Sequence, residues 1–346
     1  MVDALDGQIL HALQISPRVS FRRIAAVTGA TEQTVARRYH RLRRDGVVRV
    51  VGMQNPWAGD DDDWAHWVCR IRAKPERIPQ LADALIRRPD VSHANVLSGW
   101  TDLVCTIRAP LGENREDVVL QRLPRTNSVT GIDIDLVLHT FGQPPSAPWT
   151  GYGHTLDAEQ AGQILARVEA PAPGQPSRPT AEDRPMLDAL ADDGRAPHSR
   201  LAERTGWSVA RVRRRLATLE ASGALLYDVD LLPERLGYHL SAMLWLTVAP
   251  RHLQRVGELI AAHDQIAFAA AVSGSKNLMA VAICRDVHDL YAYLTDRLAP
   301  IEGVLSYEVS VRTQRLKQHG SVIAHGRLMN PNPARAPHRS DAKLPP

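Results

Sequence analysis

Arginine, glutamine and threonine gather in one short stretch, residues 31–44, where their chemistry suits a nucleic acid. Arginine donates in a rigid fork to phosphates and to guanine, and glutamine can pair with adenine. If the stretch is a helix, Val35, Tyr39 and Leu42 share one face and most of the basic side chains take the other. We therefore expect DNA contacts from Thr31, Glu32, Gln33, Thr34, Arg37, Arg38, Arg41 and Arg44.

These residues are expected to play different roles. Thr31 caps a helix N-terminus whose free N–H groups can meet a phosphate. The polar residues of the first two turns (Glu32, Gln33, Thr34 and Arg37) are expected to reach base edges. Arg38 and Arg41 are expected to contact the DNA backbone. The alternative is a solvated arginine face on an ordinary core helix.

A second stretch, residues 208–221, has a similar pattern with a different charge balance. Ser208 is the expected cap, and the basic candidates for DNA contact are Arg211, Arg214 and Arg215. Residues 1–52 hold nine arginines and four acids, whereas residues 179–230 hold eight arginines and nine acids. Attraction to a polyanion should therefore come mainly from the first stretch, and the second could instead belong to a sensing or assembly module.

The two stretches belong to a repeat that covers most of the chain. The segment 5–13 is echoed by 182–190, and Arg18, Gly29 and Gly46 recur as Arg195, Gly206 and Gly223, all at one constant offset. This period is far longer than the 20–50 residues of a solenoid repeat. It is the length of a small protein, so the 346-residue chain is interpreted as a fused duplicate.

Each copy begins with three short helical patterns. In the first copy, Leu5, Ile9, Leu10 and Leu13 lie on one helical face, and a break at 16–17 follows. The next two helices are separated only by 29–31, with Gly29 placed to end the earlier one. A helix, a glycine-containing turn and a basic helix make a helix-turn-helix, and the β-branched run 47–51 predicts a wing or exit strand.

A longer region of alternating strand and helix patterns then follows in each copy. The order of both sets is β-α-β-β-α-β, which is ferredoxin-like. In the first copy these elements are 64–72, 75–88, 91–97, 103–107, 115–123 and 132–138. In the second they are 239–248, 253–262, 266–272, 278–283, 287–298 and 305–311.

The fold class is therefore α+β, with two winged helix-turn-helix domains and two ferredoxin-like effector domains in tandem. The expected boundaries are 1–55 and 64–141 for the domains of the first copy, 142–179 for a Pro-rich linker, 180–232 and 237–320 for the second copy, and 326–346 for a disordered tail.

Composition and motifs exclude several classes of function. No apolar run approaches the length of a membrane span, and the N-terminus lacks a secretory signal. Cys69, Cys105 and Cys284 lack paired spacing and are expected to be reduced, which favours a cytoplasmic protein. Neither a hydrolase elbow nor a phosphate-binding loop occurs, and no cofactor is expected. The acidic run 60–63 is expected to be a solvated loop, and no metal site is expected.

Several of these segments resemble one family of bacterial transcription factors. The runs 6–13, 18–20, 24–25 and 31–46 look like the winged helix-turn-helix of the leucine-responsive regulator (Lrp/AsnC) family, and 96–103 and 136–140 resemble its effector domain. The resemblance implies double-stranded DNA as a partner and effector domains that pair sheet to sheet. It also implies a homo-oligomer, a dimer or tetramer of the fused chain, and an amino acid or related metabolite bound at loops between paired effector domains.

Those loops depart from the family's pattern, which commonly has two acidic residues after Ser-Gly. The first copy keeps one, Asp102, and the second keeps none, although Lys276 could favour a carboxylate. The residues that the resemblance assigns to effector binding are Ser98, Gly99, Trp100, Asp102, Ser273, Gly274, Lys276 and Asn277.

The alternative to a regulator is an enzyme. Some haem-biosynthesis decarboxylases that act on sirohaem resemble this family and pair two such units. Such an enzyme would need histidine and arginine gathered at the effector-domain cleft. The candidates here are His239 with Arg235, and His66 with Arg70 and Arg72. The basic helix at 31–44 favours the regulator, so no catalytic residue is assigned.

Overall fold

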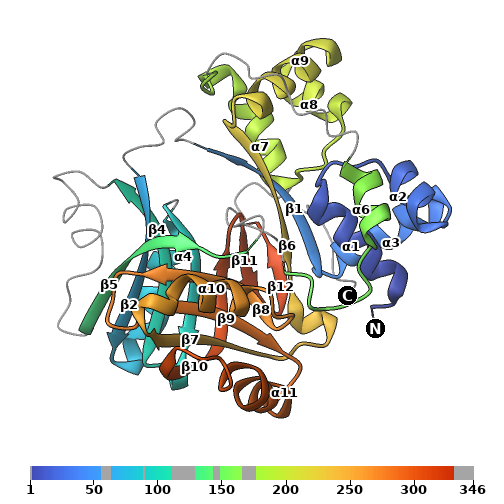
Figure 1. Cartoon of the computed structure of the whole chain (residues 1–346). Helices are drawn as coiled ribbons and strands as arrows, with labels where there is room; N and C mark the ends of the chain where they lie inside the picture. Colours follow the sequence, from blue (N-terminus) through green and yellow to red (C-terminus); the bar gives the residue numbers. More distant parts are fainter. Residues whose placement is uncertain are drawn as a thin grey trace, which may run out of the picture.

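The computed structural model describes residues 2–55, 64–88, 90–110, 129–142, 149–165 and 177–330 (Figure 1). The expected helix 115–123, the acidic run 60–63 and residues 331–346 of the expected tail lie outside this part of the chain. No helix within it is long and apolar enough to cross a membrane.

The first helix-turn-helix, here head 1, is a three-helix unit with a side-chain cap at the start of each helix, and the caps at Ser20 and Thr31 are those that the sequence predicts. The side chains of Asp3, Ser20 and Thr31 accept hydrogen bonds from the first turns of its three helices. Gly29 ends the second helix with φ +71°, a conformation that favours glycine. The helices are α1 (Ala4–Ile15), α2 (Phe21–Thr28) and α3 (Glu32–Arg44).

Head 2 repeats this unit, and Gly206 takes the place and the positive φ of Gly29. A short 3-10 turn (Ala181–Asp183) precedes its helices. They are α7 (Arg184–Asp192), α8 (His198–Thr205) and α9 (Val209–Ala221).

The strand that leaves each head pairs with its counterpart and not with a wing of its own head. β1 (Val48–Gln54) and β6 (Leu225–Leu231) run antiparallel, with Val51 opposite Asp228. This ribbon buries Val48 and Val50 against head 1, together with Val229 and Leu231. The β-branched run therefore forms the expected strand, and the strand joins the two heads.

The effector domains have the expected strand order. In the first, β2 (Trp64–Ala73), α4 (Ile78–Arg87), β3 (Val91–Leu97), β4 (Asp102–Pro110) and β5 (Val129–Thr140) are described. In the second, β7 (Leu240–Val248), α10 (Leu253–Ala261), β8 (Ile266–Val272), β9 (Leu278–Cys284), α11 (Val287–Ala292), a π-helical turn (Tyr293–Leu298) and β10 (Val304–Gln318) follow.

The two effector sheets join edge to edge into a closed ring of described strands. β5 pairs with β8, and the second half of β10 pairs with β3, which gives the order β3-β4-β2-β5-β8-β9-β7-β10. Helices α4 and α10 pack on the outside (Figure 1). Between the sheets, Val68, Val104, Met243 and Trp245 belong to one buried cluster. The sheets are thus apolar on both faces, as the nearly continuous apolar runs of β8 and β9 require.

The chain beyond the second effector domain corrects two expectations. β10 runs to Gln318 and not to 311, because residues 312–318 complete the sheet of the first copy. Residues 327–329, expected to be disordered, form strand β12 (Arg327–Met329), which pairs with β11 (Ser321–Ala324). This C-terminal hairpin lies against the end of α3, where Leu328 N–H donates to the carbonyl of Gly46.

Candidate nucleic-acid interface and effector loops

The outward face of α3 carries the expected polar side chains. Val35, Tyr39 and Leu42 are buried, whereas Gln33 and Arg37 are exposed, as are Thr31 and Glu32. The Thr31 hydroxyl accepts from Thr34 N–H at 3.2 Å and donates to the Thr34 hydroxyl at 2.9 Å, which fixes the first turn of the helix. Among the described residues, Arg37 has no ion-pair partner, so its guanidinium is available to a ligand.

Arg38 and Arg41, expected to grip the DNA backbone, make ion pairs within head 1. Arg38 Nη1 lies 2.5 Å from a carboxylate oxygen of Asp3 and 3.1 Å from one of Asp6, and Arg41 Nη2 lies 2.5 Å from Asp6. The Asp6 side chain is completely buried. The hydrogen bond from Arg38 is the main cause that lowers the pKa of Asp3. Both arginines therefore hold α1 against α3, while Arg44 stays exposed beside Asp45.

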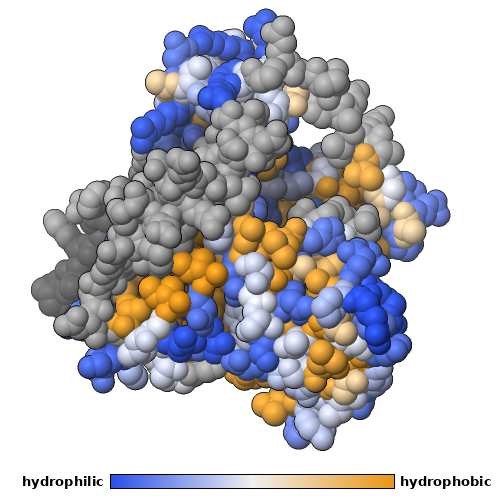
Figure 2. Space-filling model, turned by 60° about the vertical axis from the view of Figure 1, so that its left-hand side comes forward, coloured by the Kyte–Doolittle hydropathy of each residue, from blue (hydrophilic) through white to orange (hydrophobic). Residues whose placement is uncertain are grey.

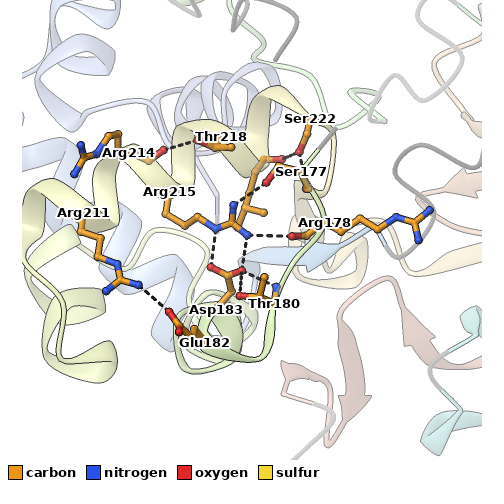
Figure 3. Close-up of polar contacts among 11 residues, drawn as sticks. Ser177, Arg178, Thr180, Glu182, Asp183, Arg211, Arg214, Arg215, Thr218 and Ser222 are labelled. Atoms are coloured by element: carbon orange, nitrogen blue, oxygen red, sulfur yellow. Dashed lines mark hydrogen bonds and ion pairs between the residues drawn. The ribbon is translucent and has the colours of Figure 1, made fainter. Parts of the chain in front are cut away.

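Head 2 repeats this arrangement around Arg215 (Figure 3). Arg215 donates to the Asp183 carboxylate at 2.8 and 2.6 Å and to the Ser177 hydroxyl at 2.7 Å. Burial alone would raise the pKa of Asp183, but the hydrogen bonds from Arg215 and Thr180 outweigh it and lower that pKa.

The other two basic candidates on α9 differ from each other. Arg211 pairs with Glu182 at 2.8 Å and lies over the Trp207 ring. The Arg214 side chain points away from this cluster, as Figure 3 shows. Arg214 occupies the position in the second repeat that Arg37 occupies in the first, and it is likewise exposed on its helix. The Ser208 hydroxyl caps α9 as expected.

Two arginines that sequence reasoning left without a role join the heads. Arg18 donates to the carbonyls of Gly194 and Ala196, and Arg195 donates to those of Pro17 and Val19. Arg195 also lies over the rings of Phe21 and Tyr39. The contacts are reciprocal across a pseudo-twofold axis. The sequence did contain a signal for these contacts, because an arginine recurs at this position in both copies of the repeat.

The first effector loop, 98–102, is held by an ion pair. Gly99 and Trp100 have positive φ, and the Trp100 side chain is exposed. Asp102, the acid that the first copy retains, accepts from Arg70 at 3.0 and 2.8 Å. Arg70 also reaches Glu308 of the second copy at 2.8 Å. The expected acid is present, but an arginine already neutralises it.

The second loop, 273–277, lies against the last strand of the first copy. The Ser273 hydroxyl accepts from Leu136 N–H at 2.9 Å, and the Asn277 amide makes two 2.8 Å bonds with the backbone of Val248. Lys276 Nζ reaches the Ser306 hydroxyl at 3.4 Å.

This loop lacks acids of its own, but a carboxylate of the other copy adjoins it. A Cβ on Gly274 would collide with Oδ1 of Asp135, so the glycine makes room for that carboxylate. Burial, and then the neighbouring Asp133, raise the pKa of Asp135. Sequence reasoning missed Asp135, although the alternation in 132–136 placed it on the polar face of β5.

The residues considered for an enzyme are not gathered at one place. Arg70 and Arg72 are in ion pairs with Asp102 and Asp133. His239 is exposed at the start of β7, and Arg235 donates to the carbonyl of Gly326. Burial lowers the pKa of His66. Within the described residues, no three His, Cys, Asp or Glu side chains are grouped so as to hold a metal ion.

Comparisons with known proteins match this organisation. The Lrp/AsnC ligand binding domain model matches residues 241–322, and the AsnC-type helix-turn-helix domain model matches residues 2–43 and 181–220. The HTH-type transcriptional regulator LrpA of Pyrococcus horikoshii is 29% identical over 136 residues, which cover 39% of this chain and 96% of the relative. LrpA1 of Halobacterium salinarum is 29% identical over 142 residues, or 41% of this chain and 99% of the relative.

A solved structure, the siroheme decarboxylase NirDL, shares the fold over nearly the whole chain. It is 17% identical with a TM-score of 0.57, and the match covers 91% of this chain and 93% of that one. Two helix-turn-helix heads and two ferredoxin-like effector domains in one polypeptide define a duplicated regulator-type fold. The helix-turn-helix and ligand-binding matches are both to models of the Lrp/AsnC family, and the two helix-turn-helix matches fit a tandem duplication.

Proposed function

We propose that this protein is a sequence-specific, DNA-binding transcription regulator that works as a pseudo-dimer in one chain. The observation that carries the proposal is the pair of heads, each matched by the AsnC-type helix-turn-helix model. The β1–β6 ribbon and the reciprocal contacts of Arg18 and Arg195 join these heads. Both heads expose an arginine at the same position of the third helix. Such a pair fits two DNA half-sites about one or two helical turns apart. The protein would bind this DNA in the cytoplasm.

The two half-sites should differ in sequence and in strength of contact. The first turns of α3 and α9 read Gln-Thr-Val-Ala and Ala-Arg-Val-Arg at equivalent positions. Ion pairs occupy the arginines behind the exposed face in both heads, which leaves Arg37 and Arg214 as the matched pair. Head 1 has an excess of positive charge and head 2 has none, so we expect head 1 to contribute more of the affinity.

Footprinting on the protein's own upstream DNA, with binding measured across salt concentrations, tests this proposal. A phased, protected site and a steep salt slope support the regulator. Arg37→Ala should weaken binding more than Arg214→Ala if head 1 dominates, and equal losses would refute that asymmetry. Binding no tighter than to random DNA would overturn the regulator proposal itself.

We place the effector, an amino acid or related metabolite, at the second loop. Asp135 offers a carboxylate for an amino group, and Lys276 offers an ammonium for a carboxylate. The loop joins the two copies, so a ligand there would bias how the sheets meet. Calorimetric titration with amino acids should give heat for the natural chain and none for Asp135→Asn. Asp133→Asn, which changes an acid paired with Arg72, is the matched control.

We also propose that fused chains associate further. Apolar side chains on the strands that close the ring are exposed, among them Leu138 of β5 and Leu305 and Tyr307 of β10. Figure 2 shows orange side chains gathered over the barrel, whereas the head at the top of the view is mainly blue. Light scattering should therefore give a multiple of 38.2 kDa, and a monomer at all concentrations would refute this part.

Catalysis on a carboxylated macrocycle is the second candidate. Arg312 in β10 donates to two neutral acceptors, Ser241 Oγ at 2.7 Å and Asn95 Oδ1 at 3.4 Å, and burial lowers its pKa to about 9. The rings of His93 and His319 meet edge to face nearby, with centroids 4.3 Å apart. A saturable Soret shift with an iron porphyrin, lost in Arg312→Met and His93→Gln, would favour the enzyme. No shift in the natural chain would exclude it.

A further inference from the structure

We infer that residues 149–165, here called the brace, couple the second effector domain to the head of the first copy. This segment belongs to what the sequence presents as a linker between the copies. It contains the helix α6 (Ala158–Leu165) and makes ordered contacts at both of its ends. The inference concerns how the parts are held together, and it does not depend on DNA binding.

The C-terminal part of the brace fills the groove between α1 and α2 of head 1. Ile164 is 1% exposed and belongs, with Leu156, to the core of that head. Gln160 Nε2 donates to the carbonyl of Val27 at 3.0 Å, and Leu156 N–H donates to Nδ1 of His11 at 3.0 Å. The brace is therefore a fourth element of head 1.

The N-terminal part of the brace is fixed to the second effector domain. Trp149 Nε1–H donates to the carbonyl of Asp264 at 2.8 Å, and the Tyr238 hydroxyl donates to the carbonyl of Gly151 at 2.6 Å. The rings of Trp149 and Tyr238 meet edge to face, with centroids 4.9 Å apart. Gly151 is so close to Asp264 that a Cβ there would collide with the Asp264 carbonyl oxygen.

One residue of head 1 also contacts the N-terminal part of the brace. Gln14, near the end of α1, donates to the carbonyl of Trp149 at 3.0 Å and accepts from the Tyr152 hydroxyl at 2.7 Å. The path from Asp264 to α1 is thus a chain of hydrogen bonds and ring contacts. Such a contiguous packed path is what mechanical coupling between two domains requires.

The duplication supplies an internal comparison, because the described residues leave the same groove of head 2 without a brace. Gly7, His11 and Val27 of head 1 face the brace, and their counterparts in the second repeat are Arg184, Asp188 and Arg204. Among the described residues, the groove of head 2 is a hollow of about 590 Å³, lined by Ala181, Arg184, Pro185, Asp188, Glu203 and Arg204. This charged lining does not suit Ile164 and Leu156, so the brace is specific to head 1.

The brace therefore connects the effector domain of the second copy to the head of the first copy. A change in the second effector domain moves Asp264 and Tyr238, and the brace transmits the change to α1 and α2 of the first copy. Head 1 is held in one position, and head 2 lacks this restraint within the described part of the chain. The two heads should therefore differ in mobility relative to the barrel.

Electron–electron distance measurements on spin labels test the inference in the full chain. One label is placed at matched exposed positions, Gln33→Cys of head 1 or Ala210→Cys of head 2, and the second label is at Leu259→Cys of α10. The three native cysteines are buried. Ile164→Asp should broaden the distance distribution for Gln33 and leave that for Ala210 unchanged. Leu165→Asp, which changes the neighbouring and 57% exposed residue, should alter neither.

Hydrogen exchange distinguishes release of the brace from loss of fold. Ile164→Asp should speed exchange in α6 about tenfold or more, while α8 and α9 keep their protection. The milder Trp149→Phe, which removes the donor to Asp264 and part of the ring contact with Tyr238, should broaden the Gln33 distribution less and in the same direction. Equal broadening for both heads, or none in either variant, would overturn the inference.

Discussion

Arg37 and Arg38 are adjacent in the sequence, yet their surroundings give them different roles, one in DNA binding and the other in the stability of head 1. Arg37 is exposed, whereas Arg38 is tied to Asp3 and Asp6. We expect Arg37→Ala to cost about 1–3 kcal/mol of DNA binding and to leave the melting temperature unchanged. Arg38→Ala should lower the melting temperature instead, because Asp6 stays buried with one partner fewer. Paired calorimetry and binding titrations check this, and reversed effects would contradict it.

Helical periodicity predicted the side of α3 on which these arginines lie, but not what meets them there. Asp6 belongs to α1, and only packing of α1 on α3 brings its carboxylate to Arg38 and Arg41. Asp135 shows the same limit, because its neighbour Gly274 is distant in the sequence and belongs to the other copy. Spacing within one helix or strand indicates the face on which a side chain lies. The residue that this side chain contacts depends on tertiary packing, which the spacing does not contain.

In head 2, Asp183 and Glu182 make a second adjacent pair with unequal roles. Asp183 is buried under Arg215 and accepts from Thr180, whereas the Glu182–Arg211 pair is exposed. Asp183→Ala should destabilise head 2 by about 2 kcal/mol, because it removes the acceptor for Thr180 N–H and leaves the Arg215 guanidinium without its carboxylate partner. Glu182→Ala should change stability by less than about 0.5 kcal/mol. Chemical denaturation followed by circular dichroism would show the difference, and equal losses would count against it.

His11 gives head 1 a dependence on pH. Burial lowers its pKa, and as a neutral ring it accepts from Leu156 N–H. The unfolded chain then binds more protons below about pH 6.5, so stability should fall as the pH drops below that value. His11→Asn keeps an acceptor without the titration and should flatten the dependence. Melting temperatures between pH 7.5 and 5 test this, and parallel curves would refute it.

At the scale of elements, the C-terminal hairpin tests how the heads are held. Leu328 of β12 is 8% exposed, and Met329 beside it is 43% exposed. Leu328→Asp should release β12 from Gly46 and speed hydrogen exchange at the end of α3, because a charge cannot stay in that contact. Met329→Asp should have no such effect. Unchanged exchange in both variants would show that the hairpin does not restrain head 1.

Elements with a local signature were predictable, and those made by distant pairing were not. The caps Ser20, Thr31 and Ser208 and the turn glycines mark the heads in the sequence itself. The second half of β10 has no such mark, because its partner β3 belongs to the other copy and lies far away in the sequence. The register between strands that are distant in the sequence is set by the assembled barrel, so a local stretch of sequence does not predict it.

At the scale of the molecule, each effector domain leaves a surface that only the other copy covers. Val68, Leu97 and Val104 of the first copy pack against Met243 and Trp245 of the second. A fragment of residues 1–165, which keeps the brace, should therefore associate into a dimer that substitutes for the missing copy. Light scattering would reveal this, and a stable monomer with native circular dichroism would contradict it.

The pairing of β3 with β10 also governs the order in which the chain can fold during synthesis. β3 ends at Leu97, and the part of β10 that pairs with it begins at Arg312. At about 5–20 residues per second, the ribosome takes roughly 10–40 s to cover this gap. Through that interval the first copy carries an unpaired strand edge and an open apolar face on every nascent chain. The fused arrangement thus removes the search for a partner at the cost of a waiting time, during which chaperones have the most to protect.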